Sequence, residues 1–145
     1  VTMPNNYVLL PGFDVDTKEL ERIKLANAVP RLTEINALIS RREKIFSCHE
    51  GSLPFLKTRI LNPLFNRFQM SPKHFYATDS CISCKRCEKV CPVDNVKLRE
   101  GRPVWGKNCT SCLTCYHLCP QQAVQYGKRT RNKGQYFNPD KSIRL

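Results

Sequence analysis

The sequence predicts a small α+β protein, in which a mainly helical N-terminal part precedes a domain organised around bound metal. Three observations support this fold class. Eight of the nine cysteines fall in two runs of identical spacing, and they lie in the second half of the chain. Apolar residues recur at helical spacing over residues 16–43, and short segments of β-forming residues surround the cysteine runs. A length of 145 residues suits one or two small domains.

The N-terminal part is expected to be helical over residues 16–43. Asp16, followed three residues later by Glu19, matches a capping box at the start of this helix. Pro30 lies inside the segment and is expected to kink the helix or divide it in two. A second helical segment, interrupted by a proline, is expected over residues 53–70.

The C-terminal part contains four short β-strand candidates. The turn residues Glu100-Gly101-Arg102 predict a hairpin between the second and third of them. Short helical turns are expected after Pro92 and Pro120, because proline favours the first turn of a helix. The four candidates are His74–Ala77, Val96–Leu98, Pro103–Trp105 and Val124–Tyr126.

The two cysteine runs repeat at a spacing of 28 residues, and each is closed by proline. A [4Fe–4S] cubane needs one thiolate for each iron, and three thiolates at i, i+3 and i+6 can reach three corners from one turning loop. The fourth corner faces away from that loop, so its ligand must come from elsewhere. The pattern is typical of two [4Fe–4S] clusters. The runs are Cys81-x-x-Cys84-x-x-Cys87-x-x-x-Cys91-Pro92 and Cys109-x-x-Cys112-x-x-Cys115-x-x-x-Cys119-Pro120.

Other uses of the cysteines explain the pattern less well. Two zinc sites would leave the x2-x2-x3-Pro register unexplained, although thiolates also select zinc. A disulfide framework conflicts with the odd number of cysteines, which is nine. Cys48 lies outside both runs and is expected to be a half-buried apolar residue.

The chain is basic, with a formal net charge of +12. Residues 81–145 hold 13 Lys and Arg against 4 Asp and Glu, a net charge of +9. Two oxidised clusters with their thiolates would contribute about −2 each. The basic charge favours a docking face for an acidic redox partner. A solvated surface and nucleic acid are the alternatives.

The sequence carries no apolar run that could span a bilayer and no signal-peptide pattern at its start. We therefore expect no membrane segment and a cytoplasmic location.

The cysteine runs resemble those of bacterial-type ferredoxins with two clusters. In those proteins the fourth cysteine of each run ligates the other cluster. The resemblance thus implies that the two halves form one pseudo-twofold unit. It assigns Cys81, Cys84, Cys87 and Cys119 to the first cluster, and Cys109, Cys112, Cys115 and Cys91 to the second.

Further segments resemble the C-terminal portion of the flavodoxin–ferredoxin fusion proteins of anaerobes. They are Cys112–Pro120, Ala123–Thr130, Tyr136–Pro139 and Val1–Tyr7. In that family a flavodoxin-like α/β domain that binds FMN precedes the ferredoxin domain. The resemblance implies that Val1–Tyr7 is the last strand of such a domain.

The resemblance also implies a division of the chain. Residues 1–45 would be a C-terminal remnant of the flavodoxin-like domain, residues 46–71 a helical connector, and residues 72–145 the ferredoxin domain with a basic tail. The phosphate-binding loop of a flavodoxin is absent from the sequence. FMN is therefore not expected on this chain alone.

Lys85 and Leu113 depart from the family pattern. Ferredoxin loops often place glycine after the second cysteine, where these two residues stand. Lysine and leucine are unfavourable at positive φ, so a more regular helical turn is expected there.

The function expected from these features is electron transfer, as a module rather than a stand-alone enzyme. The alternatives are a wiring subunit of a larger oxidoreductase, which would bind a flavin domain or subunit, and an iron–sulfur redox sensor that binds nucleic acid. The sensor would use the basic residues of the tail, interleaved with Tyr136 and Phe137. Those basic residues are Lys128, Arg129, Arg131, Lys133, Lys141 and Arg144.

Overall fold

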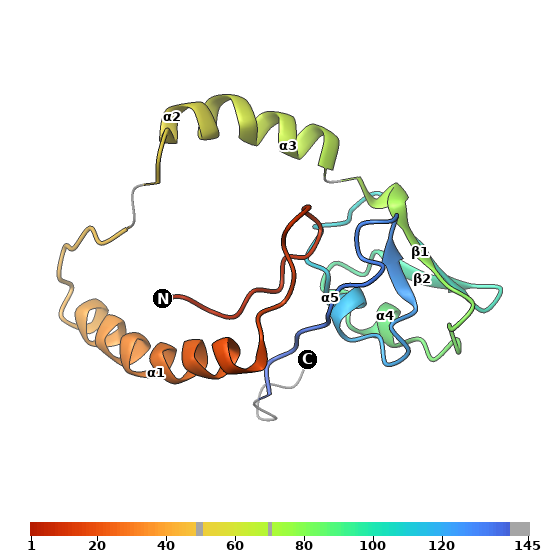
Figure 1. Cartoon of the computed structure of the whole chain (residues 1–145), viewed down its shortest axis with the longest axis horizontal. Coiled ribbons are helices and arrows are strands. Elements are labelled where there is room, and N and C mark those ends of the chain that lie inside the picture. The colour runs from red at the N-terminus through yellow and green to blue at the C-terminus, as the bar shows by residue number, and fades with distance from the viewer. Residues whose placement is uncertain (49–50, 70, 140–145) are drawn as a thin grey trace. The chain divides into compact units, whose positions relative to one another are not determined.

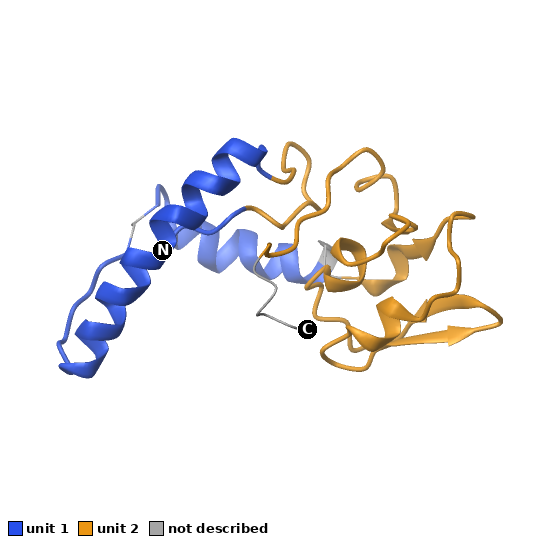
Figure 2. Cartoon of the chain, turned by 90° about the horizontal axis from the view of Figure 1, so that it is seen from below, with its two compact units in different colours: residues 1–4, 16–67 blue, residues 5–15, 68–145 orange. Residues whose placement is uncertain are grey.

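The protein is described by a computed structural model that covers residues 1–48, 51–69 and 71–139. The chain divides into two compact units (Figure 2). The first unit consists of Val1–Pro4 and Asp16–Arg67, and the second of Asn5–Val15 with the described residues from Phe68 onward. No helix within the described ranges combines the length and the apolar content that a membrane span requires.

The first unit is built on helix α1, Lys18–Ser40 (Figure 1). Thr17 is its N-cap, and the Thr17 hydroxyl accepts a hydrogen bond from the Leu20 N–H at 3.3 Å. The expected cap at Asp16 is therefore wrong by one residue, and Asp16 instead pairs with Lys24 at 2.7 Å. The helix continues through Pro30 and is not divided there. A single proline removes one backbone hydrogen bond, which a helix of this length tolerates.

The second helical segment of this unit changes its winding along its length. It consists of helix α2, Pro54–Leu56, a π-helical turn η1, Lys57–Leu61, and helix α3, Asn62–Gln69. Pro63 lies inside this run, and the helical residues continue through it without a break. The expected interruption at this proline is therefore wrong.

Several apolar side chains of the first unit are open to solvent. Val29 and Ile39 on α1 are 68% and 67% exposed, and Phe55 on α2 is 74% exposed. Cys48, which was expected to be half-buried, is also exposed. It lies in a segment, residues 43–48, that forms no helix or strand.

The second unit contains two small antiparallel sheets. Strand β1, Phe75–Ala77, follows a 3₁₀ turn η2, Pro72–His74, and pairs with strand β4, Val124–Tyr126. Strand β2, Val96–Arg99, pairs with strand β3, Arg102–Trp105. The two-residue turn between β2 and β3 has positive φ at both Glu100 (48°) and Gly101 (78°), as tight hairpin turns require. The expected hairpin is confirmed.

The elements of the second unit repeat at the 28-residue spacing of the cysteines. Helix α4, Arg86–Lys89, recurs as helix α5, Thr114–His117. Strand β1 recurs within β3, and β2 recurs as β4. Because β1 pairs with β4 and β2 with β3, each sheet joins one strand from each half.

The short helices contain the third cysteine of each run and end before the fourth, and they do not follow Pro92 and Pro120 as expected. The third and fourth cysteines stand at i and i+4, which is the spacing of one helical turn. Non-helical turns follow the two prolines.

Residues 5–15 belong to the second unit, although the sequence-based ranges place them with the flavodoxin-like remnant. Val8 and Leu9 are 0% and 2% exposed. Lys133 Nζ donates to the backbone oxygens of Val8 (2.6 Å) and Leu10 (2.8 Å). Val1–Tyr7 does not form the strand that the resemblance implies, since no strand in the described residues pairs with it. The core consists of Val8, Leu9, Phe75, Leu113, Cys115, Tyr116, Val124 and Tyr126.

Candidate functional site

The cysteine loops are shaped by residues in the left-handed region. Lys85 and Leu113 have φ of 60° and 61°, so the more regular turn expected at these positions is wrong. Each residue is the N-cap of the short helix that follows it. Left-handed backbone reverses the chain sharply, and this lets successive cysteines of a run face the same space. The same conformation recurs at the equivalent pairs Ser83 and Ser111, and Asp94 and Gln122.

Three cysteines of the first run and one of the second line a common pocket. They are Cys81, Cys84, Cys87 and Cys119. The wall between the thiols is largely apolar and includes Leu98, Pro103, Ala123 and Val124. We call this space the first thiol pocket.

The second thiol pocket has the reverse composition, with three cysteines of the second run and one of the first. They are Cys91, Cys109, Cys112 and Cys115. Its wall includes Phe75, Val96, Trp105 and Leu113. Each pocket thus contains the four cysteines that the ferredoxin resemblance assigns to one cluster.

Hydrogen bonds to sulfur recur at equivalent places in the two halves. The backbone N–H of Asn95 donates to Cys91 Sγ at 3.2 Å, and that of Ala123 donates to Cys119 Sγ at 3.2 Å. The Thr114 hydroxyl donates to Cys112 Sγ at 3.3 Å. Donors of this kind stabilise a thiolate, because hydrogen bonds to the charged form favour it.

The thiols differ in how readily they lose a proton. Burial raises the pKa of Cys115 to about 12, and it also raises the pKa values of Cys87 and Cys109. Burial likewise opposes ionisation of Cys112, but hydrogen bonds from Thr114 and Thr110 outweigh it and lower its pKa. Buried thiolates need a nearby positive charge, and a coordinated metal deprotonates a thiol outright.

The donor set of each pocket fits an iron–sulfur cluster. Four thiols surround an apolar space, and soft thiolates are the ligands that such clusters use. In the described part of the chain, no three His, Cys, Asp or Glu side chains converge closely enough to hold a single metal ion. A cubane makes a different demand, because each of its thiolates binds a separate iron.

The two pockets are neighbours within the second unit. Helices α4 and α5, which carry Cys87 and Cys115, pack against each other. A charge on Cys87 raises the pKa of Cys115, so the two sulfurs interact electrostatically. Redox groups held in the two pockets would therefore lie side by side.

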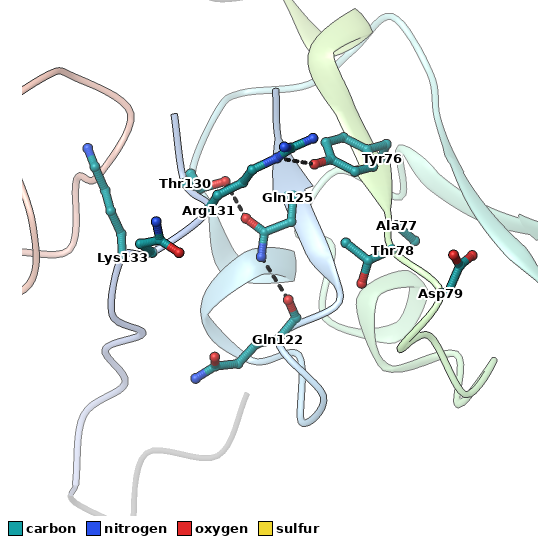
Figure 3. A pocket seen from close by; sticks show the side chains of 10 residues that line it. Tyr76, Ala77, Thr78, Asp79, Gln122, Gln125, Thr130, Arg131 and Lys133 are labelled. Atoms are coloured by element: carbon teal, nitrogen blue, oxygen red, sulfur yellow. Dashed lines mark hydrogen bonds between the residues drawn. The ribbon is translucent and has the colours of Figure 1, made fainter. Parts of the chain in front are cut away.

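A third, more open pocket of about 570 Å³ lies outside the cysteine loops. It is bordered by β1, the turn before β4 and the segment after β4 (Figure 3). Thr130 Oγ1 donates to Gln125 Oε1 at 2.7 Å, and Gln125 Nε2 donates to the backbone oxygen of Gln122 at 2.8 Å. Arg131 Nε donates to the Tyr76 hydroxyl at 3.2 Å (Figure 3). Several of its polar groups thus bond one another.

A basic patch borders a further pocket of the second unit. Lys128, Arg129 and Arg131 are exposed there. Lys133 is partly buried, and its Nζ donates to the backbone oxygens of Val8 and Leu10. We use the term basic patch for Lys128, Arg129, Arg131 and Lys133. The other two basic residues of the tail, Lys141 and Arg144, lie outside the described residues.

Asn95 is a positioning residue that sequence reasoning missed. It is 8% exposed, and its side chain donates to the Gly106 backbone oxygen (3.2 Å) and accepts from the Asn108 N–H (2.8 Å). These bonds tie the end of the first cysteine run to the start of the second. One signal in the sequence could have identified this position. Asn95 follows Cys91 by four residues, and Ala123 follows Cys119 by the same number, so the two positions are equivalent in the repeat.

Comparison with known proteins supports an iron–sulfur domain. A model of the family described as 4Fe-4S dicluster domain matches residues 80–124, which contain both cysteine runs. The match supports a ferredoxin-like iron–sulfur domain with a role in electron transfer. No curated protein and no solved structure matches the chain significantly.

Proposed function

We propose that the chain transfers electrons through two [4Fe–4S] clusters. The first cluster is held by the cysteines of the first thiol pocket, and the second by those of the second thiol pocket. The ligands are Cys81, Cys84, Cys87 and Cys119 for the first, and Cys109, Cys112, Cys115 and Cys91 for the second.

The observation that carries this proposal is the mixed composition of the pockets. Each pocket combines three thiols of one run with the fourth thiol of the other. Zinc binding by each run separately would instead group Cys91 with the first run and Cys119 with the second. The exchange makes the two halves one cooperative unit.

The residues of the chain have three tasks in this function. The thiolates hold the clusters, and the N–H groups of Asn95 and Ala123 stabilise the sulfur charge at the fourth ligands. The apolar walls keep water away, which affects the reduction potential. When bound, each cluster supplies a group that takes up and releases one electron.

Metal and flavin analysis of the anaerobically purified protein tests the proposal. We expect about eight irons and eight acid-labile sulfides per chain, as two cubanes require. We expect no stoichiometric FMN on this chain alone. Zinc without sulfide would overturn the proposal. About four irons per chain would mean that the chain holds one cluster and not two.

The cellular setting that we propose is the cytoplasm of an anaerobe, with a flavodoxin-like partner or domain that holds FMN. Flavins connect two-electron and one-electron steps, and clusters handle single electrons. The exposed apolar residues Val29, Ile39 and Phe55 favour a second candidate function, that of a wiring subunit covered by a larger oxidoreductase. A flavoprotein that remains bound to the chain in a fixed ratio through purification would support that candidate.

The basic patch supports an acidic redox partner. Three of its four cations are exposed and lie in the unit that carries the cysteines. Charge of one sign on one face steers an oppositely charged protein into contact. Nucleic acid is the competing ligand, and binding to DNA or RNA at low salt would support it instead.

A further inference from the structure

Two buried polar side-chain atoms in the second unit have no hydrogen-bond partner in the described part of the chain. They are Trp105 Nε1 and Ser111 Oγ. Buried donors in folded proteins are nearly always satisfied, so each of these two atoms requires an acceptor.

Trp105 lies in the wall of the second thiol pocket, at the end of β3. Its ring stacks on Phe75 with centroids 5.5 Å apart and an interplanar angle of 16°. Phe75 is itself in the core, so the indole is held in a defined orientation. Cys115 lines the same pocket, so the Trp105 indole and this thiol border one space.

Ser111 lies within the loop that carries the second run and is 4% exposed. Its backbone N–H donates to Cys109 Sγ at 3.4 Å. Its hydroxyl is buried in the same loop, between Cys109 and Cys112, and has no partner among the described residues.

The first thiol pocket lacks both features. Ser83, which stands 28 residues before Ser111, gives its hydroxyl to the Gly101 backbone oxygen at 2.5 Å. Ala77 occupies the position equivalent to Trp105 and has no side-chain donor. The two unpaired donors therefore distinguish the second pocket from the first.

We propose that the Trp105 indole N–H and the Ser111 hydroxyl donate hydrogen bonds to sulfur atoms of the cluster in the second thiol pocket and raise its reduction potential. The inference rests on the proposed function. Reduction adds one electron to a cluster and forms no bond, so the reduced form is the more negative one. Donors aimed at its sulfur atoms stabilise that form more than the oxidised form.

The test compares reduction potentials of three variants of the full, cluster-loaded chain. Trp105→Phe removes the N–H and keeps an aromatic ring on Phe75, and Ser111→Ala removes the hydroxyl. Ser83→Ala is the matched control, because its hydroxyl already has a backbone acceptor. Anaerobic titration with dithionite as the one-electron donor gives the potentials. Cysteine β-proton resonances, shifted by the clusters, identify which cluster is reduced.

We expect Trp105→Phe to lower the equilibrium constant for reduction of the second cluster about tenfold. This change corresponds to a reduction potential about 59 mV lower for a one-electron couple. Ser111→Ala is expected to shift it in the same direction, and Ser83→Ala is expected to leave it unchanged. Unchanged potentials in both Trp105→Phe and Ser111→Ala, with about eight irons retained, would overturn the inference and leave the proposed function standing. Loss of clusters from the wild type would instead contradict the proposed function.

A second measurement covers the case in which Trp105→Phe fails to hold its clusters. The chain has a single tryptophan, so indole-¹⁵N labelling of the wild type gives one side-chain N–H signal. An N–H bonded to a cluster sulfur shifts strongly when the second cluster is reduced. A signal that keeps its position on reduction would refute the role of Trp105.

Discussion

His117 Nε2 lies 2.6 Å from the backbone oxygen of Asn6, a residue 111 positions earlier in the chain. The other ring nitrogen, Nδ1, accepts a hydrogen bond from the Tyr136 N–H at 3.0 Å. Nε2 must therefore carry the ring hydrogen and donate it to Asn6. Burial lowers the pKa of His117, which agrees with a neutral ring. One imidazole thus fastens two distant segments to the helix that carries Cys115.

Replacement of His117 by phenylalanine is expected to destabilise the second unit. Phe keeps the volume of the ring but leaves the Tyr136 N–H and the Asn6 oxygen without their partner. We expect a loss of about 1–3 kcal/mol in the free energy of unfolding. Chemical denaturation of the loaded protein measures it. His74→Phe is the control, because His74 is exposed and contacts Tyr126 only by ring packing at 5.3 Å among the interactions described. Equal stability of the two variants would contradict the assigned role of His117.

Glycine is expected to have opposite effects at the two equivalent left-handed positions. Lys85 is exposed at φ 60°, so Lys85→Gly relieves backbone strain of about 1 kcal/mol and stabilises the protein. Leu113 has the same conformation but is 2% exposed in the core. Leu113→Gly relieves the same strain and creates a cavity, for which losses of about 2–5 kcal/mol are usual. Thermal unfolding compares the two variants, and a stabilised Leu113→Gly would count against this account of the core.

Loss of a fourth cysteine is expected to damage the cluster of the other run. Cys91→Ala removes a thiol from the second thiol pocket, and Cys119→Ala removes one from the first. Cluster-shifted cysteine resonances show which cluster is altered in each variant. If Cys91→Ala affected only the resonances of Cys81, Cys84 and Cys87, the exchange of ligands would be refuted. Cys48→Ala is the control, since Cys48 is exposed and lines neither thiol pocket.

Removal of the clusters is expected to unfold the second unit. Its strands have only three or four residues, and the thiol pockets occupy the space where a larger domain has an apolar core. Metal binding then provides much of the folding free energy. Treatment with a chelator and an oxidant should abolish the strand signal in circular dichroism. The signal of α1, in the first unit, serves as the internal reference. Retention of native strand content without iron would disprove the dependence.

Electron transfer to an acidic flavodoxin is expected to slow as salt rises. Exposed charges are screened over about 10 Å at 0.1 M salt, so steering by the basic patch weakens. Changing Lys128, Arg129 and Arg131 together to glutamine should lower the rate and reduce its salt dependence. The control changes Arg99 and Lys107, which are also exposed but lie outside the patch. Stopped-flow measurement of cluster oxidation gives the rate for the patch variant and for the control variant. Equal rates in the two variants would show that the patch is not part of the docking site.

The sequence alone was enough to predict the periodic and strongly local features. The spacing of the cysteines within the two runs, which begin at Cys81 and Cys109, indicated the kind of cofactor. Cluster ligation requires cysteines at particular intervals. The 28-residue repeat and the β2–β3 hairpin also follow from local pattern, and the structure has both. The left-handed conformation of Lys85 was missed, because its residue type argued against positive φ. There the geometry of the loop overrides the preference of the side chain.

Only the tertiary structure decided what depends on contacts between distant residues. Asn6 gave no signal of its bond to His117, and nothing in the sequence indicated that the Trp105 N–H is buried without a partner in the wall of the second thiol pocket. The sequence-based ranges place residues 5–15 in another domain. In the structure they belong to the second unit and supply Val8 to the core around the cysteines. Local patterns reflect interactions over a few residues and carry little information on partners a hundred residues away. The sequence thus determined that this chain has the thiols for iron–sulfur clusters and, through the resemblance, implied how they are grouped, whereas the fold decided which backbone donors face their sulfurs.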